Sequence, residues 1–534
     1  MSDSASTKDC EHIEVCGRKA LEGHEGKCIL HSEDLGKDED QFEEALEEHQ
    51  GDYGGDFRRM VFPGETDFRH EAFEEANFEE SKFEDANFSF AAFEKANFKD
   101  AAFGDADFRE ADSGDADFEG ATFEEANFTR AAFEEGNFKN TTFEEAANFS
   151  GATLEDANFE NATFGVAYFF EVAFERINFK DATFEGINVV NAVFEEVSFM
   201  RATFEGSYFE HVTFEEANFF DATFEHVTFE EVAFEEANFM GATFENKAVF
   251  DQSFEPWKND QSVEATFSDC DFGGDVLFSG SSEEKRAFAG GKVNLEDVNI
   301  APDASLHFRY ADLSWCRFLR TDLRDAEFTG VKWCEEVSGD EWFRRAGLYD
   351  EVIEDEKYRS LGDILRTTFG RIGSPKGPHW TLFELRQNSG QGRWSEVERL
   401  YRQLKRNYEE RGDFPRAGDF HIGEKEARRK NPRTNGPLKF LLYAYRALSK
   451  YGERALPAGA WLLFVIFACA GGYAYFGPEE YLTALRHSFQ ASFFPVSPIE
   501  IKGSGVEWVN LFQRVVSPLI LFLLALALRQ RVKR

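Results

Sequence analysis

Phenylalanine recurs at every fifth position through most of the first half of this chain. Between residues 68 and 143, 15 of the 16 positions in this register are Phe, and Ser113 is the exception. One extra residue in the stretch EEAANF shifts the register, which resumes over 149–244. There, 18 of 20 positions are Phe, with Leu154 and Val189 as substitutes. Any fold of this chain must therefore bury a long series of evenly spaced rings.

Neither a regular helix nor a straight strand can bury side chains that recur every five residues on one common face. Five residues rotate a helical side chain by about 140°, which spreads the rings around every face. In a strand, an odd period sends successive rings to opposite faces. A chain that turns a corner every five residues instead points each Phe, and the small residue two positions before it, toward one axis. Four such sides make a coil of about 20 residues, and stacked coils make a solenoid with Glu pairs on its outside.

A second period of ten residues runs through the first repeat block. The residue before every other Phe is always Asn or Asp, while the intervening ones are mostly Ala or Thr. On a coil of about 20 residues, this period places Asx side chains on two opposite sides, where they stabilise turns and stack in ladders. The positions are Asp67, Asn77, Asn87, Asn97, Asp107, Asp117, Asn127 and Asn137.

The repeats resemble a known family. ANFEE, ANFKD, ATFEE and ANFMG match the A(D/N)Lxx motif of pentapeptide-repeat proteins, and the resemblance covers residues 66–246 almost without a break. It implies a mainly β fold, a right-handed quadrilateral β-helix. Fragments of the rhythm return later, from Phe308 through Leu313 and Phe318 to Phe328. We expect these to form a second short stack that extends or docks on the first, with an irregular loop or bulge, FGGDVLFSGSSEEKRAFAGG, between the two.

The sequence divides into five predicted regions. Within residues 341–440, helix signals run from Ser395, a candidate N-cap, to Gly412, and Pro415 opens a second helix. We therefore expect a helical hairpin there. The regions are a zinc-knuckle-like segment with an acidic cap (1–58), the pentapeptide-repeat β-helix (59–256), an irregular insert with the second short stack (257–340), a basic helical region (341–440) and a two-span membrane domain (441–534).

Three cysteines and a histidine near the start follow the spacing C-x5-C-x11-C-x2-H. Thiolate and imidazole are the ligands that a tetrahedral structural zinc site uses. The pattern therefore predicts a closed zinc knuckle, in which His12 or His24 is an alternative ligand; the other interpretation is a set of reduced thiols in a tail. The predicted ligands are Cys10, Cys16, Cys28 and His31.

Two apolar stretches near the end predict membrane-spanning helices. Residues 457–476 carry no charge and match a bilayer core of about 30 Å. The second stretch, 509–528, includes Arg514 and Pro518. Lys and Arg flank the outer end of each stretch, so both termini are predicted to be cytoplasmic at the cell membrane.

The connector between these stretches lies where an ion channel of the two-helix type has its pore loop. We expect its first part to form a short amphipathic or re-entrant helix. A potassium filter needs a run of Thr-Val-Gly-Tyr-Gly, whereas Pro495 and Pro498 occupy the matching place here. The layout is channel-like and the filter residues are missing.

Charge is distributed unevenly along the chain. Residues 1–340 carry a formal charge of −53 and residues 341–534 one of +10. Acidity of this kind is typical of a surface adapted to high salt, as in a halophile, or of one that attracts a cationic partner or imitates DNA.

The sequence offers no phosphate loop, no Ser-His-Asp or Cys-His arrangement and no distinct carboxylate pair, so we expect no enzyme. The leading hypothesis is a membrane-anchored cytoplasmic scaffold that binds an unknown protein through the repeat faces or the helical hairpin. A channel-like protein with an oligomeric pore is one alternative, and the membrane segment also allows a homo-oligomer. The other is the DNA-mimicking, topoisomerase-binding role that the family resemblance implies. Direct nucleic-acid binding is not expected.

Overall fold

The computed structural model describes residues 10–12, 18–20, 27–53, 55–254, 264–335, 345–356, 393–477, 480–494 and 505–532. The chain forms two compact units. Unit 1 comprises residues 1–321 and 326–332, and unit 2 comprises residues 322–325 and 333–534. In unit 1, helix α2 (Glu39–Tyr53) comes first and a long series of short strands follows.

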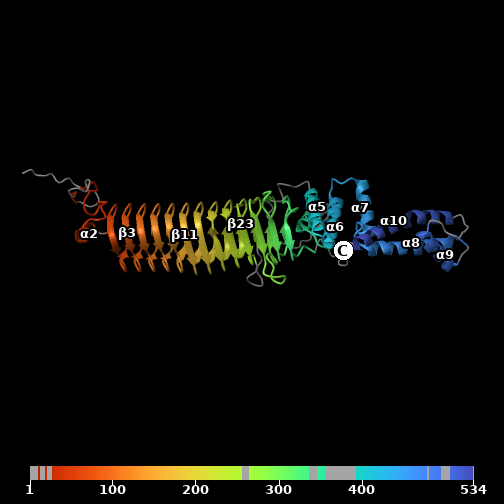
Figure 1. The fold of residues 1–534 in the computed structure, drawn as a ribbon, viewed down its shortest axis with the longest axis horizontal. Coiled ribbons are helices and arrows are strands. Elements are labelled where there is room, and N and C mark those ends of the chain that lie inside the picture. Colours follow the sequence, from red (N-terminus) through yellow and green to blue (C-terminus); the bar gives the residue numbers. More distant parts are fainter. Residues whose placement is uncertain are drawn as a thin grey trace, which may run out of the picture. The chain divides into compact units, whose positions relative to one another are not determined.

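Unit 1 is a β-solenoid of about 13 turns (Figure 1). Its strands form two sheets in which every neighbouring pair is parallel, so each strand pairs with the equivalent strands of the coils before and after it. The 18-stranded sheet contains β1 (Val61–Asp67), β3 (Lys82–Asn87), β5 (Ala102–Asp107), β7 (Thr122–Asn127), β9 (Thr142–Asn148), β11 (Thr163–Phe170), β13 (Thr183–Val190), β16 (Thr203–Glu205), β17 (Tyr208–Glu210), β19 (Thr223–Glu225), β20 (Val227–Glu230), β22 (Thr243–Phe244), β23 (Lys247–Asp251), β25 (Asp271–Phe272), β26 (Asp275–Ser279), β28 (Asn299–Ile300), β29 (Leu306–Arg309) and β31 (Glu327–Thr329). The 13-stranded sheet contains β2 (Ala72–Phe73), β4 (Ala92–Phe93), β6 (Asp112–Ser113), β8 (Ala132–Phe133), β10 (Thr153–Glu155), β12 (Ala173–Glu175), β14 (Val193–Glu195), β15 (Val197–Ser198), β18 (Thr213–Asn218), β21 (Ala233–Asn238), β24 (Glu264–Thr266), β27 (Lys292–Asn294) and β30 (Cys316–Arg317).

The core of the solenoid consists of stacked phenylalanine rings. Phe98 stacks on Phe78 and on Phe118, each at 4.8 Å between ring centroids, and the planes are within 3° of parallel. Rings on adjacent sides of the coil meet edge to face, as Phe88 and Phe98 do at 5.6 Å and 81°. Both geometries are favourable for aromatic pairs. The five-residue period therefore builds four aligned columns of rings, as predicted.

The predicted Asx ladder is confirmed. The Oδ1 atom of Asn77 accepts a hydrogen bond from the backbone N–H of Glu79 at 3.0 Å, which closes an Asx turn. The same atom accepts from Nδ2 of Asn97, one coil further on, at 3.2 Å. Asn97 repeats the turn with Lys99 at 3.0 Å. On this side of the coil, hydrogen bonds between Asx side chains join coils in pairs, as they also do from Asn137 to Asp117. On the opposite side, Asn87 closes its own turn with Ser89.

The extra residue in EEAANF is absorbed as a bulge in β9, where the register of pairing with β7 shifts. The ring columns continue across it, because Phe128 still stacks on Phe149 at 4.9 Å and 6°.

The prediction of an irregular loop or bulge after residue 271 is wrong in part, whereas the predicted second stack does extend the first. Strand β26 lies in that stretch and pairs with β23 before it and β29 after it. The ring column also continues, from Phe250 through Phe278 and Phe308 to Phe328. Residues inserted between sides break the five-residue period in the sequence, but hydrogen bonding between coils keeps each strand in register. Residues 264–329 therefore continue the same two sheets.

Unit 2 is helical. Its described residues include a helical stretch at 349–356 and the helices α5 (Trp394–Glu410), α6 (Phe414–Lys430), α7 (Gly436–Ser449), α8 (Ala455–Phe476), α9 (Tyr481–Phe493) and α10 (Val506–Val532). The predicted hairpin is α5 and α6, and both Tyr401 and Tyr408 contact Phe420 across it. The predicted N-cap is wrong: Arg393 precedes the helix without a side-chain cap bond, and Ser395 lies inside the first turn. Asp413 caps α6 by accepting from the N–H of Arg416.

Candidate functional site

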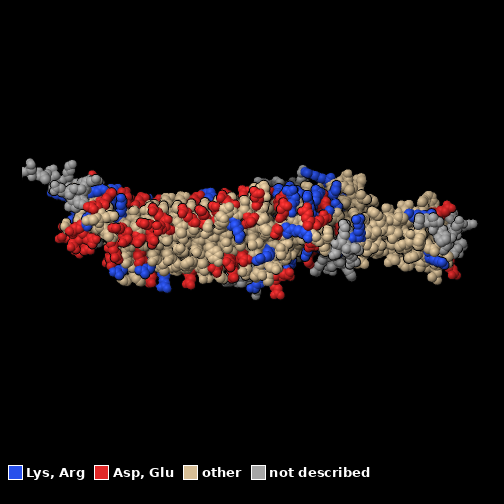
Figure 2. All heavy atoms as spheres, in the orientation of Figure 1, with Lys and Arg blue, Asp and Glu red and all other residues tan. Residues whose placement is uncertain are grey.

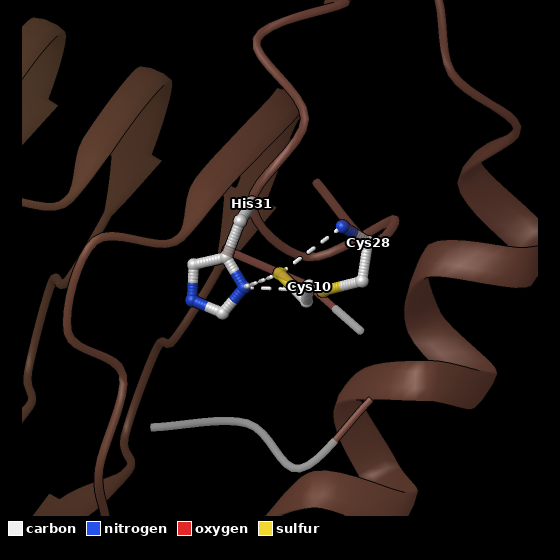
Figure 3. Close-up of side chains that lie close together, drawn as sticks. All are labelled: Cys10, Cys28 and His31. Carbon is white, nitrogen blue, oxygen red and sulfur yellow. Dashed lines mark hydrogen bonds between the residues drawn. The ribbon is translucent and has the colours of Figure 1, made fainter. Parts of the chain in front are cut away.

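Three of the four predicted zinc ligands lie together in unit 1 (Figure 3). Sγ of Cys28 is 3.1 Å from Nδ1 of His31, and Sγ of Cys10 is 3.8 Å from the same nitrogen. All three side chains are buried. The fourth predicted ligand, Cys16, lies outside the described residues. This group can hold a metal ion.

Contacts around the group orient its donor atoms inward. Nε2 of His31 lies 3.2 Å from the carbonyl oxygen of Arg58, and an N–H on Nε2 leaves the Nδ1 lone pair facing the sulfur atoms. Carbonyl partners of this kind fix the ring of metal-binding histidines. The backbone N–H of Cys28 donates to Sγ of Cys10 at 3.3 Å. The ring of His12, an alternative ligand, lies 4.9 Å from the His31 ring.

The Cys/His group is tied to the first coil of the solenoid. The N–H of Val61, in β1, donates to the carbonyl of Leu30 at 2.8 Å. Lys37 donates to the carbonyls of Ser32 and Val61 at 3.0 and 2.5 Å, and burial lowers the pKa of Lys37 to about 8. In α2, Phe42 packs edge to face on Phe62 at 5.6 Å. Solenoids need their terminal coils covered, and this segment covers one.

The four outer sides of the solenoid differ in how their charged side chains are paired. Sides half a coil apart carry pairs of exposed acids, such as Glu124–Glu125 and Glu144–Glu145 on one and Glu134–Glu135 and Glu215–Glu216 on the other. Among the described residues, none of these eight carboxylates takes part in an ion pair. Figure 2 shows the acidic side chains gathered along this part of the chain. These eight carboxylates therefore form two acid-pair surfaces without an internal counter-ion, although Arg176 pairs with Glu155, Asp156 and Glu175 on the second side.

An intervening side of the solenoid is neutralised by ion pairs between coils. Lys99 pairs with Glu119 at 2.9 Å, and Glu160 pairs with Lys139 at 3.1 Å and Lys180 at 2.7 Å. The two kinds of side alternate around the coil because the ten-residue period gives opposite sides similar residue types and adjacent sides different ones.

Unit 2 contains two helices, α8 and α10, that are long and apolar enough to cross a membrane. They match the two predicted spans. The predicted short helix between the spans is α9, and its buried face contains His487, Ser488 and Ser492. Nε2 of Gln513, in α10, donates to the carbonyl of Ser488 at 2.7 Å and to Oγ of Ser492 at 2.8 Å. Oγ of Ser488 donates to the carbonyl of Ile466, in α8, at 2.7 Å. A polar cluster therefore joins α9 to both apolar helices.

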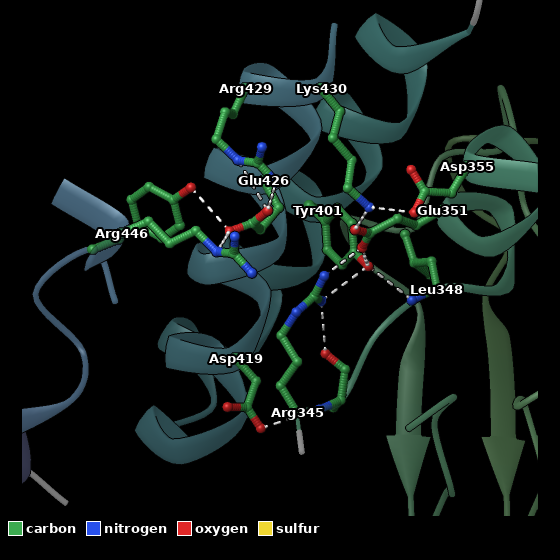
Figure 4. A network of polar contacts seen from close by, with 12 residues as sticks. Arg345, Leu348, Glu351, Asp355, Tyr401, Asp419, Glu426, Arg429, Lys430 and Arg446 are labelled. Atoms are coloured by element: carbon green, nitrogen blue, oxygen red, sulfur yellow. Dashed lines mark hydrogen bonds and ion pairs between the residues drawn. The ribbon is translucent and has the colours of Figure 1, made fainter. Parts of the chain in front are cut away.

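A second polar cluster lies in the interior of unit 2 and has no signal in the sequence (Figure 4). Arg345 bonds Glu351, and the hydroxyl of Tyr401 accepts from Arg345 at 3.1 Å and donates to Glu351 at 2.6 Å. Lys430 reaches the other oxygen of Glu351 at 3.0 Å. Burial opposes ionisation of Glu351, but the charges of Arg345 and Lys430 outweigh it and hold the pKa of Glu351 below its usual value.

Models of pentapeptide repeats match three successive stretches of unit 1. Pentapeptide repeats of 8 copies match residues 72–110, those of 9 copies match 128–173, and the pentapeptide repeat region matches 177–254. The solenoid is a pentapeptide-repeat domain. The resemblance stated from the repeat motifs is thus confirmed. No protein with a curated description matches the chain.

Solved structures of other pentapeptide-repeat proteins are similar to this domain. A trypsin-treated QnrB1, a plasmid-mediated fluoroquinolone resistance protein, has 18% identity and a TM-score of 0.25, covering 41% of this chain and 91% of its own. HetL, a pentapeptide repeat protein involved in heterocyst differentiation regulation from the cyanobacterium Nostoc sp., has 17% identity and a TM-score of 0.15, covering 34% of this chain and 85% of its own.

Proposed function

We propose that the protein is a membrane-anchored cytoplasmic scaffold whose pentapeptide-repeat domain binds a cationic protein. The two acid-pair surfaces support this proposal, because carboxylates without an internal counter-ion remain free to meet positive charge from outside. Helices α8 and α10 supply the anchor. Only 33% and 22% of their apolar stretches are buried, unlike the core helices of a soluble protein. The Lys and Arg residues that flank the two helices support a cytoplasmic position for both termini.

Capture from native membranes tests the scaffold. We expect replacement of Glu124, Glu125, Glu144 and Glu145 by Gln to reduce severalfold the amount of the main partner recovered with the full-length protein. Raising the salt concentration should weaken recovery with the wild type as well, because surface charge is screened over about 10 Å at 0.1 M.

The matched control removes the same charge from the opposite side, at Glu134, Glu135, Glu215 and Glu216. A loss with one set alone identifies the binding surface. Undiminished recovery with both sets, at unchanged melting temperature, would contradict the proposal.

We further propose that the Cys/His group binds structural zinc, with Cys10, Cys28 and His31 as ligands and Cys16 as the fourth. Two thiolates and an imidazole fit zinc better than the hard cations, which prefer oxygen. Bound zinc would fix the terminal segment over the first coil, since the ligands Cys28 and His31 flank Leu30, whose carbonyl accepts from the N–H of Val61 in β1.

Cys28→Ser should abolish stoichiometric zinc in the purified protein and increase hydrogen exchange in β1, because the covering segment loses its cross-link. The control is Cys270→Ser, which changes a buried thiol in the solenoid that donates to the carbonyl of Phe239 at 2.8 Å. Equal zinc content in wild type and Cys28→Ser, measured by mass spectrometry, would rule out the site.

A channel-like function is the second candidate. The observation in its favour is α9, a short helix fixed by hydrogen bonds to both proposed spans. The predicted absence of a filter concerns residues 495–504, including Pro495 and Pro498, which lie outside the described residues. Selective current in a planar bilayer would favour this candidate over the scaffold. A salt-sensitive complex with topoisomerase would favour the third hypothesis, DNA mimicry.

A further inference from the structure

Helix α7 has apolar side chains on two faces, and one of them is buried inside unit 2. Leu442 forms a cluster with Ile422 of α6 and with Tyr451, and Leu438 and Tyr445 pack against that cluster. This face accounts for the attachment of α7 to the rest of the unit.

The other face of α7 is apolar and exposed. Phe440 is 77% exposed and Leu441 62%. Pro437 and Ala447 are also exposed, and Ala444 is half-buried. These five residues follow the 3–4 spacing of a single helical face. Large apolar side chains this exposed, side by side, indicate a surface that contacts something other than water.

The chain turns sharply between α7 and α8. Lys450, Tyr451 and Gly452 all have left-handed backbone conformations, with φ of 47°, 63° and 84°. The hydroxyl of Tyr451 donates to Glu426 at 2.9 Å, which holds this turn against α6. Consequently α7 does not continue into α8, and in Figure 1 it runs across the direction of α8 and α10.

Aromatic and basic residues lie beside the exposed face. Nε1 of Trp461, in α8, donates to the carbonyl of Ala447 at 3.0 Å, so the end of α7 lies near a Trp close to the start of the span. Trp is enriched at the boundary between lipid and water. Arg428 and Arg433 are exposed at the approach to α7, and Lys439 lies within it. Basic residues at this position attract anionic headgroups.

We propose that α7 lies in the headgroup layer of an anionic membrane, with Phe440 and Leu441 inserted among the acyl chains. The inference rests on the proposed membrane anchorage through α8 and α10. A helix that crosses the direction of the spans lies parallel to the membrane plane, and an apolar face flanked by Arg and Lys is the composition of an interfacial helix. The lipid surface thus covers the face that unit 2 leaves exposed.

Photo-crosslinking from α7 tests the proposal in the full-length protein. Benzoylphenylalanine replaces Phe440 in one variant and Leu442, on the buried face, in the matched control. Both proteins are reconstituted in vesicles of phosphatidylcholine, alone or mixed equally with phosphatidylglycerol. We expect a lipid adduct at position 440, severalfold above that at 442, that increases with phosphatidylglycerol. Arg433→Gln combined with Lys439→Gln should reduce this increase.

A second measurement distinguishes failure of the interfacial position of α7 from failure of the membrane anchorage through α8 and α10. Resistance of the protein to extraction from the vesicles by alkaline carbonate reports on α8 and α10 alone. If the protein resists extraction but position 440 gives no lipid adduct, or cross-links mainly to a second copy of the chain, the interfacial helix is wrong. If carbonate releases the protein, the anchorage itself is wrong.

Discussion

Phe98→Ala is expected to lower the free energy of unfolding of the pentapeptide-repeat domain by about 3–5 kcal/mol. Phe98 is fully buried, and its ring stacks on the rings of the coils before and after it. Truncation therefore removes two stacked contacts and several edge-to-face contacts at once. The coils around the cavity cannot collapse into it easily, because backbone hydrogen bonds fix their spacing.

Denaturant unfolding of the full-length protein, followed by hydrogen exchange in β3 and β5, measures this loss. Phe90→Ala is the matched control, since Phe90 belongs to the same repeat block but is 47% exposed. It should change the free energy of unfolding by at most about 1 kcal/mol. Equal losses in the two variants would mean that the ring columns do not provide the stability of the domain.

Glu351→Gln is expected to destabilise unit 2 by about 3–5 kcal/mol, because it leaves Arg345 charged and buried without its counter-ion. The side chains of Arg345 and Glu351 are only 4% and 1% exposed, so water cannot replace the lost charge. The hydroxyl of Tyr401 also loses its carboxylate acceptor. Thermal unfolding monitored by hydrogen exchange in α5 and α6 reports the effect on this unit.

The double variant Arg345→Met/Glu351→Leu is the control for this prediction. Removing both charges leaves no unpaired ion, because Lys430, which also contacts Glu351, keeps its ion pair with Asp355 at 3.1 Å. Well-packed apolar replacements of buried ion pairs are often neutral. We therefore expect the double variant to be more stable than Glu351→Gln. A single variant that unfolds like the wild type would show that the ion pair contributes nothing to the stability of the unit.

The repeat fold could be predicted because its cause is local. A Phe at each fifth residue specifies both the corner and the core, and no distant contact is needed to choose the register. The same approach failed after residue 250, where insertions such as those around β26 break the period. There the alignment comes from hydrogen bonds between coils, which a single-sequence period does not reveal.

The candidate sites were predictable to different degrees. Cys28 and His31 are close in sequence, so their pairing was expected, and Cys10 joins them in the structure. The positions of the two apolar helices, α8 and α10, could be predicted because each is a long stretch of apolar residues. In contrast, nothing local marks Arg345 and Glu351 as buried, because their burial depends on how α5 and α6 pack around them. The exposed face of α7 likewise becomes visible only when its other face is seen to be occupied.

The repetition of the acid pairs has a consequence for binding. Glu124–Glu125 and Glu144–Glu145 lie on successive coils, in strands β7 and β9 that pair with each other, so the two acid pairs are about 4.8 Å apart along the solenoid. A cationic partner that recognises one such pair can therefore dock in two neighbouring registers of similar energy. Two equivalent registers raise the apparent affinity through statistics alone, and they let a bound partner shift by one coil without fully dissociating.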